Sequence, residues 1–537
     1  MSEQKLIRGT MILTASIFIS KMLGLIYIFP FTAIVGHGGI ALYSYGYTPY
    51  TVILSLATLG VPLAVSKFVS KYNALGDYRT GQRLLKSGLI LMTLTGIVAF
   101  IILFLLAEPI AHRVLNPEAL EGNSISDAVF TIRMVSVALL IVPVMALIRG
   151  YFQGHQSMGP TAVSQVVEQI FRIVFILSMT YIIINVLDGE VGLAVGFATF
   201  GAFVGAIGGL VVLLIYWKKR WSGLQHQIEE STIDHNISLP KIYKELFAYA
   251  LPISFVGLSI PLYQMIDLMT FNEALRNTGL SSDVVEIYYA AFTQTSHKLI
   301  LIPVAIATAM SITILPTVMN AFINQETERL QRTITQTYQI ILFLTIPAAV
   351  GLMVLAEPSY AALFGMEEYI IGSEILRSYA PVAVAFSIFA VTASLLQGIN
   401  KQKYAVIALT AGVLFKILFN GALISLFDAQ GAVLATGVGY VIAISINVWA
   451  IGKFADYDYS YIRKRALLIC LFSAVMAAVV SFLSYGFQQL IPLESRGNAM
   501  IVLSISILSG VIVYLNVTVR SGLAGEILGD RFGFLKK

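Results

Sequence analysis

The stretch LMTLTGIVAFIILFLLAEP, residues 91–109, has no charged residue before Glu108. About 20 mostly apolar residues in a helix are enough to cross the hydrocarbon core of a bilayer. The rest of the chain has the same character, because 57% of its 537 residues are hydrophobic and only 12% are charged. Soluble domains have about 25% charged residues. We therefore expect an all-α integral membrane protein without a separate soluble domain.

Similar apolar segments recur from one end of the chain to the other, and they predict 14 transmembrane helices. The first is too long for the apolar region of a signal peptide, so we expect it to be retained. The predicted spans cover residues 10–33, 40–65, 85–107, 127–148, 159–186, 191–217, 246–271, 285–319, 333–356, 375–396, 403–426, 431–452, 464–487 and 497–519.

The Lys and Arg residues that lie outside these spans or in the first two residues of one divide unequally between the two sides of the membrane. With the N-terminus in the cytoplasm, 25 of them lie on the inner side, and only Arg113, Arg276 and Arg496 lie on the outer side. Cytoplasmic loops carry an excess of Lys and Arg, so this division supports an even number of spans with both termini inside. The net charge of +5 reflects topology and does not indicate a nucleic-acid partner.

The chain also contains an internal repeat. LAEP at 106–109 recurs at 355–358, and further on Arg172 corresponds to Lys416 in the same order. Spans 1–6 would then repeat as spans 7–12 in the same orientation, and such parallel repeats commonly enclose a central site. We predict an N-lobe at 1–217, a cytoplasmic linker at 218–245, a C-lobe at 246–453, and spans 13 and 14 with a cytoplasmic tail at 454–537.

Beyond the first two residues of each predicted span, eight charged side chains fall inside the spans, six of them basic. An ionisable residue within a membrane marks a functional site by default, and an excess of positive charge suits an anion. The bases are Lys21, Arg133, Arg172, Lys298, Arg377 and Lys416, and the acids are Glu168 and Asp267. Arg133 and Arg377 lie in the outer parts of their spans, where a structural role is the stronger interpretation.

Glu168 and Arg172 are four residues apart, so they share a helix face and can pair. One interpretation is a local pair that lowers its own insertion cost, and the other is a cavity wall. Lys21, Lys298 and Lys416 have no acidic residue three or four positions away. The prolines within spans allow a similar pair of interpretations, as ordinary kinks or as breaks beside a cavity.

Polar residues gather around Lys298 in the eighth span. The run TQTSHK, residues 293–298, places hydroxyl groups, an amide and an imidazole before the ammonium. Gln294 and Lys298 would share one helix face, with His297 beside them. A Lys near a helix end usually reaches toward the interface, but Lys298 lies about 13 residues into its span, which favours a functional role.

Several catalytic signatures are missing from the sequence. It has neither the G-x-x-x-x-G-K-[ST] loop of ATP hydrolysis nor the H-E-x-x-H zinc motif. The DYD triplet at 456–458 lies in a short inner loop and is too brief to indicate a glycosyltransferase. The single cysteine, Cys470, is expected to be a small packing residue. We therefore expect no enzyme, no cofactor and no metal site.

Two longer motifs resemble a known family. RGYFQGHQSMGPTAVSQVVEQIFR at 149–172 and KFVSKYNALGDY at 67–78 are similar to the Gram-positive branch of the MOP exporter superfamily. That branch contains the YtgP-type, MurJ-like lipid II flippases and the stage V sporulation protein B group. The resemblance extends over essentially the whole chain. It implies two six-helix lobes in a V around a cationic cavity, with spans 13 and 14 forming a groove for a polyprenyl tail.

The resemblance also assigns individual residues. ISKMLG at 19–24 and SHKLILIP at 296–303 resemble basic motifs of the family's first and eighth spans, so Lys21 and Lys298 fall on required basic positions. A second basic position in span 1 is Tyr27 here. Some relatives hold sodium between spans 7 and 11, where Asp267 could be a ligand. Lys416 stands where an oxygen ligand would be needed, and the alternative is that it pairs with Asp267 as a coupling or structural ion pair.

The predicted function is translocation of undecaprenyl-pyrophosphate-linked peptidoglycan precursor, lipid II, from the inner to the outer leaflet of the bacterial plasma membrane by alternating access. Gln294, His297, Arg172 and Glu168 complete the predicted substrate site. The partners would be this lipid-linked anionic glycan, membrane lipids and, as a further candidate, the cell-wall synthesis machinery. The alternatives are a flippase for a teichoic acid, capsule or spore-cortex precursor, a multidrug antiporter of the MATE type, and a non-transporting scaffold.

Overall fold

A computed structural model describes residues 3–58, 60–115, 122–229, 231 and 238–528. Over these ranges every regular element is a helix, as expected for an all-α chain. The helices form two compact units, Met1–Met269 and Thr270–Lys537. The boundary between the two units falls inside one helix, α10. Each unit contains about half of the chain.

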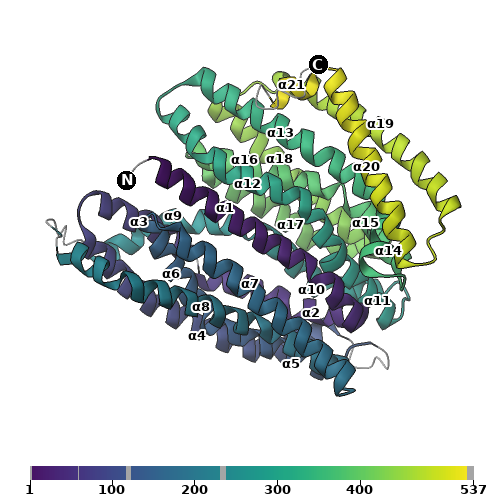
Figure 1. Cartoon of the computed structure of the whole chain (residues 1–537), viewed down its shortest axis with the longest axis horizontal. Helices are drawn as coiled ribbons and strands as arrows, with labels where there is room; N and C mark the ends of the chain where they lie inside the picture. The colour runs from purple at the N-terminus through teal and green to yellow at the C-terminus, as the bar shows by residue number, and fades with distance from the viewer. Residues whose placement is uncertain (1–2, 59, 116–121, 230, 232–237, 529–537) are drawn as a thin grey trace. The chain divides into compact units, whose positions relative to one another are not determined.

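The first unit is built from long helices that lie side by side (Figure 1). α7 packs along α8, α1 packs on α7, and α5 packs on α8. Its elements are α1 (Glu3–Ile26), α2 (Ile28–Thr58), α3 (Val61–Ala74), α4 (Tyr78–Val114), α5 (Ile125–Ser136), the 3₁₀ turn η1 (Val137–Leu140), α6 (Val142–Gly154), α7 (Met158–Tyr181), the π-helix η2 (Ile182–Val186), α8 (Val191–Glu229) and α9 (Leu239–Gly257), followed by α10 (Ser259–Arg276).

The second unit repeats the pairing of long helices and adds two more. α17 packs along α18, as α7 does along α8, and α19 and α20 form the yellow pair in Figure 1. Its elements are α11 (Ser282–Ala290), the π-helix η3 (Ala291–Thr295), α12 (Ser296–Ile323), α13 (Thr327–Val354), α14 (Ala356–Phe364), α15 (Tyr369–Tyr379), α16 (Val382–Gly398), α17 (Gln402–Phe427), α18 (Ala429–Ala455), α19 (Ser460–Leu490), α20 (Arg496–Arg520) and α21 (Leu523–Leu528).

The helices are long and apolar enough for a multi-pass membrane protein. Eleven described helices could each cross a bilayer, or up to 13 spans result if each of two bent helix pairs is one span. One of the 11 is the 60-residue run Ala15–Ala74, which is longer than one span requires. The predicted number of 14 would require this run to contain two spans, and it stays a prediction.

Breaks in the helices have local causes. Gly36 interrupts α2 with φ 69° and ψ −179°, a conformation that glycine adopts without the steric cost of a Cβ. α15 and α16 are bent by 42° where Pro381 stands before the first residue of α16. Pro303 and Pro347, by contrast, lie inside continuous helices. The prolines thus stand both at a bend and inside continuous helices, and their position beside a cavity stays a prediction.

Much of the predicted linker, 218–245, is helical. α8 continues through it to Glu229, and α9 begins at Leu239. Ile242 and Leu246 of α9 are buried against Val65 and Phe68 of α3. α9 thus begins within the predicted linker and is held there by an apolar contact that the sequence pattern did not indicate.

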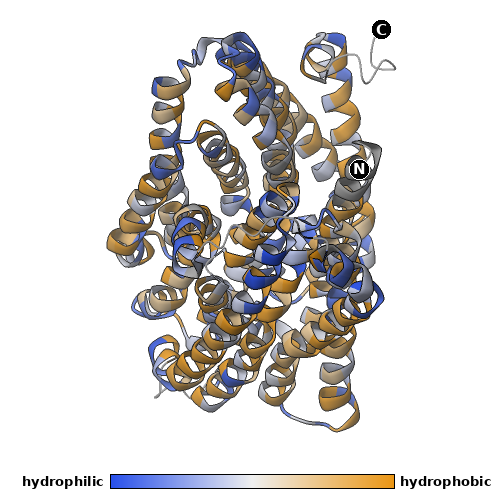
Figure 2. Cartoon of the chain, turned by 90° about the vertical axis from the view of Figure 1, so that its left-hand side faces the viewer, coloured by the Kyte–Doolittle hydropathy of each residue, from blue (hydrophilic) through white to orange (hydrophobic). Residues whose placement is uncertain are grey.

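The outer surface of the helices is strongly apolar, as Figure 2 shows by the orange along most of them. Leu105 of α4 is 67% exposed, and Phe482 of α19 is 77% exposed. Such exposure is expected where lipid is the solvent. Cys470 is also exposed, so its predicted role as a packing residue is wrong. Hydrophobicity alone does not distinguish a core-facing from a lipid-facing position when both environments are apolar.

Candidate functional site

Glu168 on α7 binds two arginines in the first unit. Its Oε1 accepts a hydrogen bond from Nη2 of Arg172 at 2.7 Å, and its Oε2 accepts one from Nη2 of Arg149 at 2.9 Å. The three side chains are only 13–14% exposed. Two guanidinium groups on one carboxylate leave this cluster with one excess positive charge. The predicted Glu168–Arg172 pair is therefore present, as part of a larger network.

Arg149 is the member of this cluster that sequence reasoning missed. Its position just beyond a predicted span placed it among the inner-loop basic residues. The structure puts it inside α6, where Nη2 and Nε donate to Oγ of Ser164 at 2.7 and 3.1 Å. Ser164 and Glu168 are four residues apart on α7, so they present one polar face. The four-residue spacing of Ser164 and Glu168 is the pattern in the sequence that could have indicated a polar partner on another helix.

Small residues on α8 allow α7 to come close at this cluster. A Cβ on Gly205 would lie 2.7 Å from the backbone oxygen of Glu168, and one on Gly209 would lie 3.1 Å from Nη2 of Arg149. Oγ of Ser164 donates to the backbone oxygen of Gly209 at 2.9 Å. Gly205 and Gly209, four residues apart on α8, thus also set the position of the charged network.

Arg172 connects this network to a row of aromatic rings. Its Nη1 donates to Oη of Tyr47 at 3.3 Å, and the ring of Tyr47 stacks on Tyr43 at a centroid distance of 5.4 Å. Oη of Tyr27 donates to Oη of Tyr43 at 3.3 Å. Tyr27, where the family resemblance expects a base, therefore lies in the aromatic row that ends at Arg172.

Lys21 lies on α1, which packs against α7. The contact is close at Gly24, one turn further along, where a Cβ would lie 3.2 Å from Nε2 of Gln169. Lys21 itself is exposed. The structure thus places Lys21, an exposed residue, on the helix that packs against α7, which carries Glu168.

In the second unit the TQTSHK run covers the end of a π-helix, η3, and the first residues of α12. Gln294 is 7% exposed and His297 is 4% exposed, whereas Lys298 is partly exposed. Short π-helical turns are frequent at functional sites. The sequence gives no indication of this π turn, because one extra residue in a single helical turn does not change the amino-acid composition of the segment.

Hydrogen bonds and rings hold the η3 segment in place. Nδ1 of His297 lies 3.0 Å from Oη of Tyr379, and its ring packs edge-on to Phe386 at 6.2 Å. Oγ1 of Thr295 lies 2.7 Å from Oη of Tyr360. These contacts make His297 a residue that orients the segment, while Lys298 at its end remains partly accessible.

Lys416 on α17 is fully buried, at 0% exposure. Its Nζ donates to Oγ1 of Thr436 on α18 and lies 5.7 Å from the ring centroid of Phe292 in η3. The structure therefore brings Lys416 to the same segment as Gln294 and His297. Asp267 is also buried, at 2% exposure, and its pairing with Lys416 stays a prediction.

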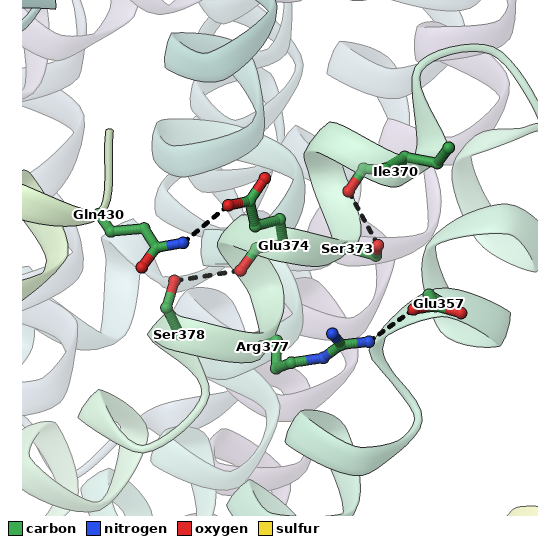
Figure 3. A pocket seen from close by; sticks show the side chains of 7 residues that line it. All are labelled: Glu357, Ile370, Ser373, Glu374, Arg377, Ser378 and Gln430. Atoms are coloured by element: carbon green, nitrogen blue, oxygen red, sulfur yellow. Dashed lines mark hydrogen bonds and ion pairs between the residues drawn. The ribbon is translucent and has the colours of Figure 1, made fainter. Parts of the chain in front are cut away.

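The two outer arginines have structural contacts. Nη2 of Arg377 donates to Oε1 of Glu357 at 2.6 Å, and this pair lines a hollow of about 450 Å³ with Glu374 and Gln430 (Figure 3). Arg133 lies 4.8 Å from the ring centroid of Phe104. Glu357 belongs to the second LAEP motif.

Other sequence features have local structural roles. In the DYD triplet, Asp456 adopts φ 49° after α18, and Oδ1 of Asp458 accepts a hydrogen bond from the Ser460 amide at 2.8 Å. The triplet thus ends one helix and begins the next. Across the described ranges no three His, Cys, Asp or Glu side chains come together as a metal site would need.

Comparison with known proteins gives close and distant matches. The lipid II flippase MurJ of Bacillus subtilis (strain 168) is 46% identical over 542 residues, covering 100% of this chain and 99% of that protein. A solved structure of the lipid II flippase MurJ in an inward closed conformation matches with a TM-score of 0.67 at 16% identity, over 96% of this chain and 99% of that chain.

The fold is shared more widely. The inward-facing structure of a multidrug resistance MATE family transporter of the MOP superfamily matches with a TM-score of 0.64 at 17% identity, over 81% of this chain and 95% of that chain. Residues 6–322, more than half of this chain, match the model of the family described as polysaccharide biosynthesis protein. The resemblance predicted from the motifs is confirmed: the chain belongs to the polysaccharide biosynthesis protein family and is a relative of the Bacillus subtilis lipid II flippase.

Proposed function

We propose that this protein is a flippase that moves lipid II, an undecaprenyl-pyrophosphate-linked glycan, from the inner to the outer leaflet. The observation that carries the proposal is the 46% identity to a lipid II flippase over the full length of both chains. The MATE-like fold alone would not separate this function from drug export, because both kinds of transporter match it. A flippase makes and breaks no covalent bond, which agrees with the expectation that the chain is not an enzyme.

The intramembrane charges support an anionic cargo. Beyond the first two residues of each span, six basic and two acidic residues fall within the predicted spans, and Arg149, which pairs with Glu168, adds one more positive charge. A cation exporter would more naturally have acidic residues at these depths. We propose that Lys21 and Lys298 each meet a phosphate of the headgroup, because Lys acts as a point-charge phosphate binder.

Each of these two lysines is supported by its surroundings. Lys21 is accessible on a helix that packs beside the charged cluster, and Lys298 follows a buried, hydrogen-bonded π turn. Arg172 and Glu168 then stiffen the wall behind Lys21, and Gln294 and His297 orient the segment before Lys298. Asp267 and Lys416 form the proposed coupling or structural ion pair.

The membrane potential is the proposed energy source. A charge crossing the membrane gains or loses about 2.3 kcal/mol per 100 mV. An inside-negative potential drives an anionic headgroup outward and returns an empty cationic site inward. The proposed setting is the bacterial plasma membrane with both termini in the cytoplasm, which follows from the 25-to-3 division of basic residues. Contacts with the cell-wall synthesis machinery belong to the same proposal.

The test is exposure of lipid II on the outer leaflet of cells depleted of this protein, read with an external enzyme that cleaves only exposed lipid II. We expect cleavage to collapse while total lipid II rises. Wild-type protein should restore cleavage, Lys21→Ala and Lys298→Ala should not, and Lys244→Ala, which removes an exposed positive charge from α9, should restore it as the matched control.

Each alternative has its own outcome in this test. Normal exposure in depleted cells that lack a second flippase would point to another lipid-linked glycan, such as a teichoic acid, capsule or spore-cortex precursor. Full rescue by both lysine variants, inserted at wild-type levels, would show that the proposed site is wrong. A non-transporting scaffold would restore the exposure of lipid II only when another transporter is also present. Transport by the purified protein in vesicles distinguishes a flippase from such a scaffold.

A further inference from the structure

One end of α17 and α18 carries a group of basic and aromatic side chains that the proposed transport site does not use. Nζ of Lys401 lies 4.7 Å from the ring centroid of Phe454, and Nζ of Lys453 lies 5.8 Å from the same centroid. Nζ of Lys453 also lies 5.1 Å from the ring of Trp449. The ring of Tyr404 packs on Phe454 at 4.8 Å. Two ammonium groups therefore converge on one aromatic ring.

This convergence has an electrostatic cost that an anion would remove. Across the described parts of the chain, no carboxylate forms an ion pair with Lys401 or Lys453. The nearby acids are Asp456, which is exposed, and Asp458, which accepts hydrogen bonds from Ser460. Lys401 is also the N-cap of α17 and makes no side-chain cap, so the first amides of α17 add a partial positive charge.

A hollow lies directly beside the two lysines. It has a volume of about 800 Å³ and is lined by Phe322, Ile323, Asn400, Phe454 and Asp456, among others. Ile323 is 68% exposed. Phe454 thus belongs both to the hollow and to the basic group. A polar headgroup of several heavy atoms fits a space of this size with its phosphate at the lysines.

Apolar side chains are exposed along both α17 and α18. Ile407 and Leu414 of α17 are each 52% exposed, and Val441 of α18 is 57% exposed. Trp449, 53% exposed, stands between this surface and the lysines, as tryptophan does at membrane interfaces. A ligand with an anionic head and an apolar tail would contact the lysines with its head and the apolar side chains with its tail. An acidic peptide would leave the apolar side chains without a contact.

We propose that this end of α17–α18 binds an anionic glycerophospholipid, with its phosphate between Lys401 and Lys453 and an acyl chain along Ile407, Leu414 and Val441. The leaflet is the one that meets the basic loops, the cytoplasmic leaflet in the proposed topology. Basic pockets between helices on this side of a membrane are suited to anionic headgroups. The site is separate from the transported substrate, and its existence does not depend on which lipid-linked glycan is carried.

Trp449 provides the measurement, because a brominated lipid quenches only a nearby tryptophan. The protein, with Trp217→Phe and Trp221→Phe, is placed in vesicles of phosphatidylcholine and phosphatidylglycerol in which one or the other lipid is brominated. One lysine at an anionic surface favours binding about fivefold. We therefore expect phosphatidylglycerol to quench Trp449 at least fivefold more effectively at equal mole fraction.

Two variants decide the result. Lys401→Gln/Lys453→Gln should reduce the preference to about one, and Lys67→Gln/Lys71→Gln, which removes the same charge from α3 of the other unit, should leave it unchanged. Equal quenching by both lipids in the parent protein, or a preference that survives in Lys401→Gln/Lys453→Gln, overturns the proposal. If the Trp→Phe background does not fold, the difference between wild type and Trp449→Phe gives the same signal.

Discussion

Glu168 shows at the scale of one residue why a charge inside a membrane needs more than one partner. Its carboxylate is shared by Arg149 and Arg172, so the amide in Glu168→Gln would leave two buried guanidinium groups beside each other. Breaking a buried pair in this way costs about 3–5 kcal/mol. We expect a large fall in the thermal unfolding temperature of the detergent-solubilised protein.

The matched control for this prediction is Glu357→Gln. Glu357 also pairs with an arginine, but the Arg377 and Glu357 side chains are 53% and 43% exposed. An exposed pair contributes about 0–1 kcal/mol, so the unfolding temperature should hardly change. Equal effects of the two substitutions would mean that the Arg149–Glu168–Arg172 cluster is not buried as described.

Thr436 is the second residue whose removal should be costly. Its hydroxyl accepts a hydrogen bond from the fully buried ammonium of Lys416. Thr436→Val keeps the shape and removes the acceptor, which costs about 1–3 kcal/mol when a charged donor loses it. Thr436→Ser keeps the acceptor and should lose less. Thermal unfolding of the two variants in the same detergent measures the difference.

The imidazole of His155, between α6 and α7, should make the stability of the folded protein depend on pH. Burial lowers the pKa of His155 below its ordinary value of 6.5, and Arg220 adds to this, although the carbonyl of Tyr151 opposes it. The folded protein therefore holds His155 neutral, and the unfolded chain takes up the proton first. Stability should be full above pH 6.5 and should fall as the pH drops below it.

His155→Gln is the variant that tests this dependence. It removes the titrating group, so the unfolding temperature should change less between pH 7 and pH 5 than in wild type. An identical pH profile in both proteins would assign the dependence to other groups.

The residues that sequence reasoning identified correctly are those whose partners are close in the chain. Glu168 and Arg172 lie one helical turn apart, and the structure pairs them. Arg149 lies on another helix, and its connection to Glu168 depends on how α6, α7 and α8 pack. The partners of Lys416 are likewise set by packing, because Thr436 and Phe292 come from two other elements.

At the scale of elements, the packing of α7 on α8 depends on glycine. A Cβ on Gly205 would lie 2.7 Å from the backbone oxygen of Glu168 and 2.9 Å from Cβ of Arg172. Gly205→Ala should therefore push the helices apart and cost about 1–3 kcal/mol. Gly223, on the same helix, has no atom within 4 Å of such a Cβ, and Gly223→Ala should be neutral or stabilising by up to about 1 kcal/mol.

Unfolding temperatures of the two alanine variants measure this contrast. A neutral Gly205→Ala would show that α7 and α8 are further apart than described. The comparison uses one helix and one substitution, so helix propensity cancels and the remaining difference reports packing.

Elements could be predicted where hydrophobic length decides them. Each predicted span overlaps at least one described helix, although spans such as 10–33 and 375–396 run across a break between two helices. Their interruptions could not be predicted, because the π turn at Ala291–Thr295 and the start of α9 depend on contacts with distant residues. The close approach of α8 to α7 was visible in the sequence as a glycine series, but the charged network beneath it was not.

At the scale of the whole molecule, the number of spans has a direct test. In a Cys470→Ser background, single cysteines are placed at Thr278 and Glu494 on the predicted outer side and at Asn324 and Ser521 on the predicted inner side. A membrane-impermeant maleimide should label the first two in intact cells and the other two only after permeabilisation. A tag at the N-terminus should behave like Ser521→Cys. A tag on the opposite side would mean an odd number of spans.

Lys416 has a consequence for the biosynthesis of the protein. α17 enters the bilayer with an ammonium near its centre, which disfavours insertion by about 2.5–3.5 kcal/mol on the biological scale. The hydroxyl that binds this ammonium comes from α18, and Asp428 alone separates the two helices. α17 and α18 should therefore leave the translocon together as a helical hairpin, and a ribosome that stalls between them would leave α17 free to slip back out of the membrane.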